Sequence, residues 1–245
     1  MKVTSTGVKS LDHSLMDGLP LGFTVLVTGP PGSGTELLAK QFACAGGKES
    51  AVYFTTTERD EDILGTVKHF GWESKLKIVN IGDQYYQTVL ARELEISKYR
   101  QEGITLEELQ EGRQASQVPR RSQNFLTALT YEVSLLKPPF RCVIDSLDFF
   151  LENYGAPATL AAIRTIKAHT QRHEGVALMT LLSQVHDSRV ESGIEEIVDC
   201  IIDLERERSG NAFKRNLVIR KVRNHPEMTG VKAFDIVKSG ISADS

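Results

Sequence analysis

The chain has 245 residues, 40% hydrophobic and 25% charged, which is the balance of an ordinary globular protein that can bury a full core. Its formal net charge of −3 gives no overall attraction to nucleic acid or to an anionic membrane, so such a partner would need a local basic patch. The sequence contains no signal-peptide pattern and no run of roughly 18 apolar residues. We therefore expect a cytoplasmic protein that does not bind membranes.

The cysteines and histidines do not predict a metal or redox site. Cys44, Cys142 and Cys200 are widely spaced, odd in number and set in apolar segments. These features are typical of buried thiols in a reducing compartment. The six histidines show no spacing with acidic or thiol partners that would indicate a zinc site.

The first third of the chain alternates between predicted helices and predicted strands. Helices are indicated by apolar residues at helical spacing, and strands by short β-branched runs between turn residues. In chain order the expected elements are a helix over about 8–16, a strand over 23–28, a helix from 37 to about 45, a strand over 51–57, a helix that residues 58–62 open and that ends at about 70, and a strand over 77–81.

A glycine-rich loop connects the first core strand with the helix that follows it. The loop is Gly29-Pro30-Pro31-Gly32-Ser33-Gly34-Thr35-Glu36. In this context backbone N–H groups and the helix N-terminus can bind a phosphate. The glycines have the spacing of the P-loop GxxxxGK[ST]. However, Thr35 stands where a lysine would reach the phosphates, and Glu36 stands where a hydroxyl would bind Mg²⁺.

Residues 84–122 interrupt this alternation and carry no strand pattern. They hold six Lys/Arg and six Asp/Glu, with probable helices over 87–101 and 106–111. The balanced charge favours a helical surface insertion, with a partner-docking element as the alternative.

The second half of the chain resumes the alternation and then changes to strands alone after Cys200. This order predicts an α/β fold with a mostly parallel sheet flanked by helices, and with antiparallel hairpin strands at the C-terminal edge. No internal repeat is present, so residues 1–245 are expected to form one domain. The expected elements are a helix over about 125–136, a strand over 141–146, a helix over 157–173 and strands over 176–183, 200–206, 213–222 and 230–237.

Taken together, several motifs resemble the KaiC-like family of RecA-type P-loop ATPase domains, nearly from end to end. The resemblance implies a RecA fold that binds ATP or ADP with Mg²⁺. It also implies a ring or filament, commonly hexameric, with nucleotide between adjacent subunits. The motifs lie at residues 5–12, 18–22, 29–42, 70–72, 143–147, 193–196, 206–208 and 217–223.

The resemblance assigns roles to individual residues. The loop from Gly29 to Gly34 would wrap the phosphates, and Asp145 would hold Mg²⁺ through water. Glu58 would orient the attacking water, although Thr57 replaces the first of the family's two adjacent glutamates. Lys221 and Arg223 would reach into the neighbouring subunit's site.

Each of these residues also has a plain structural alternative. Asp145 could be a turn residue at a strand end, and Glu58 a charge favoured at a helix N-terminus. Lys221 and Arg223, two residues apart, could face solvent from an edge strand. Two weaker matches are Gln184 as a nucleotide sensor and residues 193–196 as a pore-facing loop or a helix start.

The substitutions at Thr35 and Glu36 decide the functional interpretation. Loss of the lysine contact removes roughly 1.5–3 kcal/mol, and a carboxylate about 4–6 Å from a triphosphate adds repulsion of about 3–4 kcal/mol. The sum of about 5 kcal/mol corresponds to about three to four decades in affinity. Lys40 lies one turn further along the helix and is expected to point away from the loop.

We therefore interpret the chain as an oligomeric regulatory or scaffolding pseudo-ATPase. It would assemble with itself or with an active paralogue, bind ATP weakly and hydrolyse it little or not at all. One alternative is an active ATPase that takes a cation from a neighbouring subunit, with Lys221 or Arg223 replacing the lysine. The other is a recombinase-like DNA-binding module, because residues 205–223 hold seven Lys/Arg against two Asp/Glu.

Overall fold

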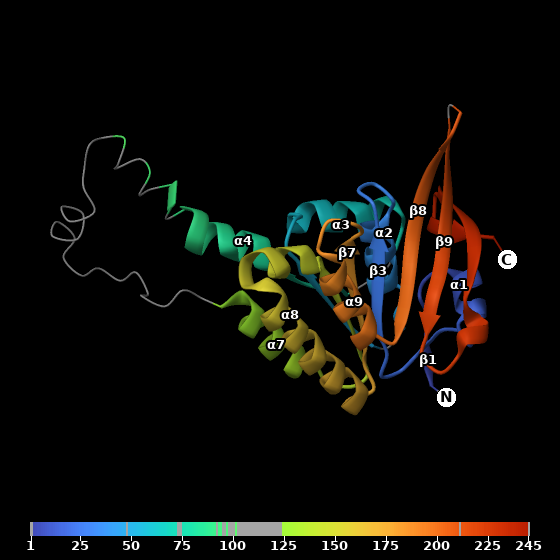
Figure 1. The fold of residues 1–245 in the computed structure, drawn as a ribbon, viewed down its shortest axis with the longest axis horizontal. Helices are drawn as coiled ribbons and strands as arrows, with labels where there is room; N and C mark the ends of the chain where they lie inside the picture. Colours follow the sequence, from blue (N-terminus) through green and yellow to red (C-terminus); the bar gives the residue numbers. More distant parts are fainter. Residues whose placement is uncertain are drawn as a thin grey trace.

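The computed structural model describes residues 2–47, 49–72, 75–91, 93–94, 97, 101, 124–210 and 212–244. These residues build a nine-stranded sheet with helices on both faces (Figure 1). Across the sheet the strands are β11 (Gly240–Ala243), β10 (Gly230–Val237), β9 (Ala212–Val222), β8 (Cys200–Ser209), β3 (Thr24–Gly29), β7 (Val176–Leu182), β6 (Phe140–Asp145), β4 (Ser50–Thr55) and β5 (Lys77–Asn80).

The sheet combines a parallel part with an antiparallel edge, which confirms the expected fold class. Strands β8, β3, β7, β6, β4 and β5 run parallel, and β9, β10 and β11 continue the sheet antiparallel. All six residues of β3 are buried, as a central parallel strand covered on both faces requires. Strands from residues 24–80 and 140–243 alternate in space, so both halves of the chain share this sheet.

Two apolar clusters lie on opposite faces of the sheet. Alternate residues of β3 separate between them: Val25 and Val27 belong to one cluster and Leu26 to the other. Helices α1, α2 and α3 cover the first face, and α4, α7, α8 and α9 cover the second. The helices are α1 (Lys9–Ser14), α2 (Thr35–Cys44), α3 (Asp60–His69), α4 (Ile81–Tyr85), the π-helix η1 (Tyr86–Leu90), α7 (Phe125–Ser134), α8 (Leu147–Arg172), α9 (Ser188–Ile197) and the 3₁₀ turn η2 (Pro226–Met228).

Several element boundaries differ from those expected. Strand β5 ends at Asn80, because its side chain accepts a hydrogen bond from the Asp83 N–H at 2.9 Å and begins α4. Helix α8 starts ten residues before the expected 157. It is interrupted at Gly155, whose φ of +75° suits glycine, and Pro157 begins its second part.

Some short strands were not predicted from the sequence. The short strands β1 (Val3–Thr4) and β2 (Leu19–Pro20) pair antiparallel apart from the main sheet, and β11 extends its edge. In the insertion, α4 and η1 form a helix that begins at Ile81 rather than at 87. The expected helix over 106–111 lies outside the described residues.

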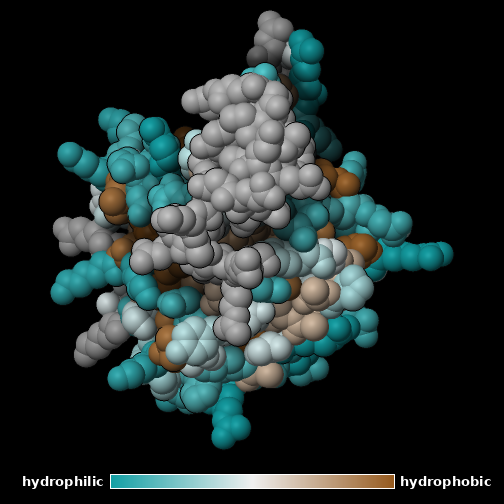
Figure 2. Space-filling model, turned by 90° about the vertical axis from the view of Figure 1, so that its left-hand side faces the viewer, coloured by the Kyte–Doolittle hydropathy of each residue, from teal (hydrophilic) through white to brown (hydrophobic). Residues whose placement is uncertain are grey.

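All three cysteines are buried, as expected. Burial raises the pKa of Cys142 to about 12 and that of Cys200 to about 12. In the described part of the chain, no helix has the length and apolar character needed to cross a membrane. The described residues on the left-hand side of the view in Figure 1 form a largely hydrophilic surface with small separate apolar areas (Figure 2).

Candidate functional site

The glycine loop lies at the carboxyl end of β3 and leads into α2. Gly32 has φ +74° and Gly34 has φ +103°. Both values strongly favour glycine over residues with a side chain. No side chain caps the N-terminus of α2 at Gly34. Ser33 is fully buried, and its hydroxyl has no hydrogen-bond partner among the described residues. The local backbone is therefore a strand, a glycine turn and an uncapped helix start, which is the geometry of an anion-binding loop.

Thr35 and Glu36 occupy the first turn of α2. The Thr35 hydroxyl lies 3.3 Å from a carboxylate oxygen of Glu36, to which it donates a hydrogen bond. Thr35 is buried, whereas Glu36 is partly exposed. A carboxylate therefore stands in the first turn of α2, next to the glycine loop.

Asp145 ends β6 at the same edge of the sheet as the loop, because these strands are parallel. The phenol of Tyr53 and the hydroxyl of Thr180 each donate a hydrogen bond of 2.6 Å to its carboxylate. These donors come from β4 and β7, the strands on either side of β6. Asp145 is thus a buried and fixed carboxylate rather than a residue of an exposed turn.

Tyr53 is a buried phenol close to the acidic side chains of this region. Burial is the main reason that its pKa lies well above the ordinary value, followed by the charge of Asp145 and its hydrogen bond. Glu58 and Glu36 raise the pKa of Tyr53 further. Three carboxylates therefore act on one buried phenol at the carboxyl edge of the sheet.

Glu58 is held by Lys40, the lysine that was expected to point away from the loop. The Lys40 ammonium lies 2.6 Å from the Glu58 carboxylate, with side-chain exposures of 4% and 26%. The backbone of Glu58 is also fixed, since its N–H donates to the Thr55 hydroxyl at 3.1 Å and its carbonyl accepts from Asn80 at 3.0 Å. The residue assigned to water activation is therefore already engaged in an ion pair.

Arg206 of β8 contacts the loop, a contact that the motif at residues 206–208 did not predict. Its guanidinium donates to the Gly32 carbonyl at 3.3 Å. The same group lies over the ring of Phe213, 4.5 Å from its centroid. Strand β8 brings it there because it pairs with β3 and continues past its end.

Lys221 and Arg223 lie at the opposite end of the sheet from the loop of their own chain. The Lys221 ammonium donates to the Glu195 carbonyl at 2.6 Å, at the C-terminal end of α9, where a cation is favoured. Burial lowers the pKa of Lys221. Arg223 pairs with the fully buried Asp199 at 3.0 Å. Neither cation is near the glycine loop of the same subunit.

Gln184 and residues 193–196, the two weaker matches to the family, both lie among the described residues. Gln184 follows β7 with φ +61°, close to the loop, since Ser183 N–H donates to the Gly29 carbonyl at 3.1 Å. Residues 193–196 lie in the last turns of α9, not at a helix start as one alternative held.

The basic stretch 205–223 does not form one continuous patch. Arg220 pairs with both Glu195 and Asp203 at 2.5 Å, and Lys221 and Arg223 are engaged as described above. The remaining basic residues belong to the far part of the β8–β9 hairpin. This separation weakens the basis for a nucleic-acid surface.

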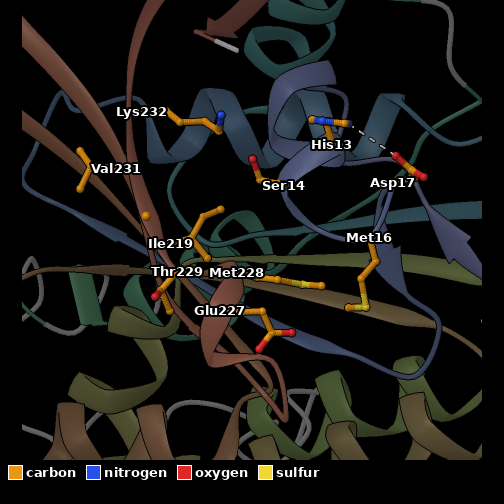
Figure 3. A pocket seen from close by; sticks show the side chains of 11 residues that line it. His13, Ser14, Met16, Asp17, Ile219, Glu227, Met228, Thr229, Val231 and Lys232 are labelled. Carbon is orange, nitrogen blue, oxygen red and sulfur yellow. Dashed lines mark ion pairs between the residues drawn. The ribbon is translucent and has the colours of Figure 1, made fainter.

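A cavity of about 570 Å³ lies apart from the loop, between α1 and the β9–β10 edge (Figure 3). Met16 and Met228 line it, and the His13–Asp17 ion pair of 3.8 Å lies at its border. Its lining includes neither the glycine loop nor Asp145. Among the described residues no group of three His, Cys, Asp or Glu side chains is placed to hold a metal ion.

Comparison with known proteins agrees with this geometry. Residues 4–244 match the family described as "ATPase: KaiC". A UPF0273 protein of Methanopyrus kandleri is 25% identical, covering 98% of this chain and 91% of that protein. The circadian clock oscillator protein KaiC of Acaryochloris marina is 26% identical over 97% of this chain, which spans only 43% of that protein.

The fold has a solved counterpart. The crystal structure of a KaiC-like protein from the hyperthermophile Pyrococcus horikoshii superposes with a TM-score of 0.67 and 23% identity. The match covers 100% of this chain and 99% of the other. The mostly parallel sheet, the glycine loop after its central strand and the family match over residues 4–244 lead to one conclusion. The chain belongs to the KaiC ATPase family, with the RecA-type P-loop fold.

Proposed function

We propose that residues 1–245 form one RecA-type subunit of an oligomer, with a regulatory or scaffolding role. In this proposal the subunit binds ATP or ADP weakly and hydrolyses ATP little or not at all. It assembles with further copies of itself or with an active paralogue. One observation carries the proposal. The backbone of the glycine loop has the geometry of a phosphate-binding loop, but Thr35 and Glu36 stand where a lysine and a hydroxyl are expected.

The backbone supports phosphate binding. Two glycines with positive φ, an uncapped helix start and a buried serine without a partner among the described residues fit an anion. Membership in an ATPase family makes the phosphates of ATP or ADP the anion to consider. Gly29, Pro30, Pro31, Gly32, Ser33 and Gly34 would surround them.

The side chains do not fit the Mg²⁺ chemistry of hydrolysis. Mg²⁺, when bound in such an enzyme, neutralises charge that develops on the phosphates. Here Glu36 replaces the hydroxyl, and both Asp145 and Glu58 already have short contacts to protein groups. Phosphoryl transfer depends on positioned positive charge, and the described lysine nearest to Glu58 is engaged with it. Slow or absent turnover follows.

Steady-state hydrolysis tests this proposal. Phosphate release from Mg-ATP by the wild-type chain is expected to equal that of the Asp145→Asn variant, because no competent site exists to be disabled. Release by the wild type that Asp145→Asn abolishes would contradict the proposal. If Arg223→Gln also abolished that release, the active-ATPase alternative with a neighbour's cation would replace it.

Assembly is the second part of the proposal. Because Lys221 and Arg223 lie far from the loop of their own subunit, we expect them to reach the glycine loop of a neighbouring subunit in the assembly. We expect Arg223→Glu to shift the chain toward monomers in light scattering, whereas Arg164→Glu, the same charge reversal at an exposed position of α8, leaves the mass unchanged. Asp199 keeps Lys167 at 2.6 Å as a partner in the Arg223 variant, so the fold is retained. A strictly monomeric wild type at high concentration, with and without nucleotide, would contradict this expectation.

A further inference from the structure

Two arginines face each other on the side of the sheet that carries α2 and the glycine loop. Arg206 of β8 is paired with Arg215 of β9 in the antiparallel register. Side chains directly opposed in this way share one face, with Cβ atoms about 4.5–5.5 Å apart. Leu204 and Leu217, two residues along each strand, belong to the apolar cluster under α1, α2 and α3. Both arginines therefore point to that same face.

Neither arginine has a carboxylate partner among the described residues. Arg206 has the contacts to the Gly32 carbonyl and the Phe213 ring given above. The Arg215 Nε is buried and has no hydrogen-bond partner in the described part of the chain. Like charges directly opposed on neighbouring strands destabilise a sheet. An anion between or beside the two guanidinium groups would relieve this repulsion.

The glycine loop is the structural feature next to this pair. A Cβ atom added to Gly32 would lie 3.0 Å from Arg206 Nη1, so the guanidinium lies directly against the exposed part of the loop. The Phe213 ring supports the flat face of the guanidinium and leaves N–H donors at its edge. Position 35, from which a lysine would contact phosphates bound in the same loop, holds a threonine.

We propose that Arg206 and Arg215 bind the polyphosphate of the nucleotide and replace the lysine missing at position 35. This inference rests on the proposed function, because it names the cations of that same weak nucleotide site. A guanidinium stays charged at every physiological pH and binds phosphate oxygens through two parallel hydrogen bonds. The cations come from the β8–β9 side of the loop, whereas Glu36 belongs to the α2 side.

Calorimetry with inorganic tripolyphosphate tests the proposal without the nucleoside. Arg206→Gln and Arg215→Gln are each expected to weaken tripolyphosphate and ATP binding by about tenfold or more, the effect of one charge-assisted contact. Arg206→Lys is expected to keep part of the affinity. Arg208→Gln is the matched control, since it removes the same charge two residues further along β8, where the side chain's hydrogen bond within the described part of the chain is to the Gly210 carbonyl. Its affinity should change less than about twofold.

Thermal melting separates ligand binding from a structural role. In phosphate-free buffer, Arg215→Gln is expected to melt at the wild-type temperature or above it, because it relieves the repulsion between the arginines. Added tripolyphosphate should raise the melting temperature of the wild type and of Arg208→Gln, but hardly that of Arg206→Gln. A purely structural arginine would instead lower the melting temperature without ligand.

Three results would overturn the inference. The first is equal tripolyphosphate affinity in Arg206→Gln and Arg208→Gln. The second is loss of adenosine binding with unchanged tripolyphosphate binding, which would place Arg206 at the base. The third is no tripolyphosphate binding by the wild type. That result would leave the proposed role as an assembly subunit without hydrolysis standing. Rapid ATP hydrolysis by the wild type would contradict the proposed function but not the arginine comparison.

Discussion

The double variant Thr35→Lys/Glu36→Thr is expected to bind Mg-ATP about a hundredfold more tightly than the wild-type chain, or better. The change returns a cation and a hydroxyl to the first turn of α2, whose glycine loop keeps its backbone geometry. The estimated loss at these two positions is about 5 kcal/mol, so recovery of about half gives two decades. Turnover should stay low, because Glu58 remains paired with Lys40.

Calorimetry of the wild type, the double variant and Glu36→Gln separates two causes of weak binding, the missing lysine contact and the repulsion by Glu36. Glu36→Gln removes only the repulsion, so its affinity should lie between those of the other two proteins. An unchanged affinity in the double variant would mean that the pocket is lost beyond the loop. Micromolar binding by the wild type would contradict the weak-binding proposal.

The parallel strands were predictable because their signal is local. The buried strands β3, β6 and β7 are continuous apolar runs, and the turn residues that bound them are adjacent in sequence. The glycine loop was equally predictable, since spacing within eight residues defines it. Strand β11 was missed because only four residues carry its pattern.

The contacts of the site were not predictable, because they join distant segments. Lys40 lies in a helix whose other residues are mainly apolar, and its partner follows 18 residues later in the loop between β4 and α3. Periodicity places a lysine on a helix face but does not show which carboxylate lies opposite it. Arg206 reaches Gly32, 174 residues away in the chain, only because β8 pairs with β3. Such pairings follow from topology, which single-sequence patterns leave open.

The Lys40–Glu58 ion pair should dominate the stability of this end of the sheet. Glu58→Ala is expected to lower the free energy of unfolding by about 3 kcal/mol or more, because it leaves a buried ammonium without a partner. That is a large fraction of the roughly 5–15 kcal/mol that stabilises a typical domain. Lys40→Met should have a smaller effect, since Glu58 is partly exposed and can be hydrated.

Equilibrium unfolding in urea measures both effects and their coupling. The double variant Lys40→Met/Glu58→Leu should recover most of the stability that Glu58→Ala loses, because no charge is then left buried. Asp62→Ala is the surface control: its partner Arg59 is 78% exposed, so no measurable change is expected. If Glu58→Ala were as stable as the wild type, Lys40 would have another route to solvent or to a partner. Glu58 would then not be engaged in the way that the proposed lack of hydrolysis requires.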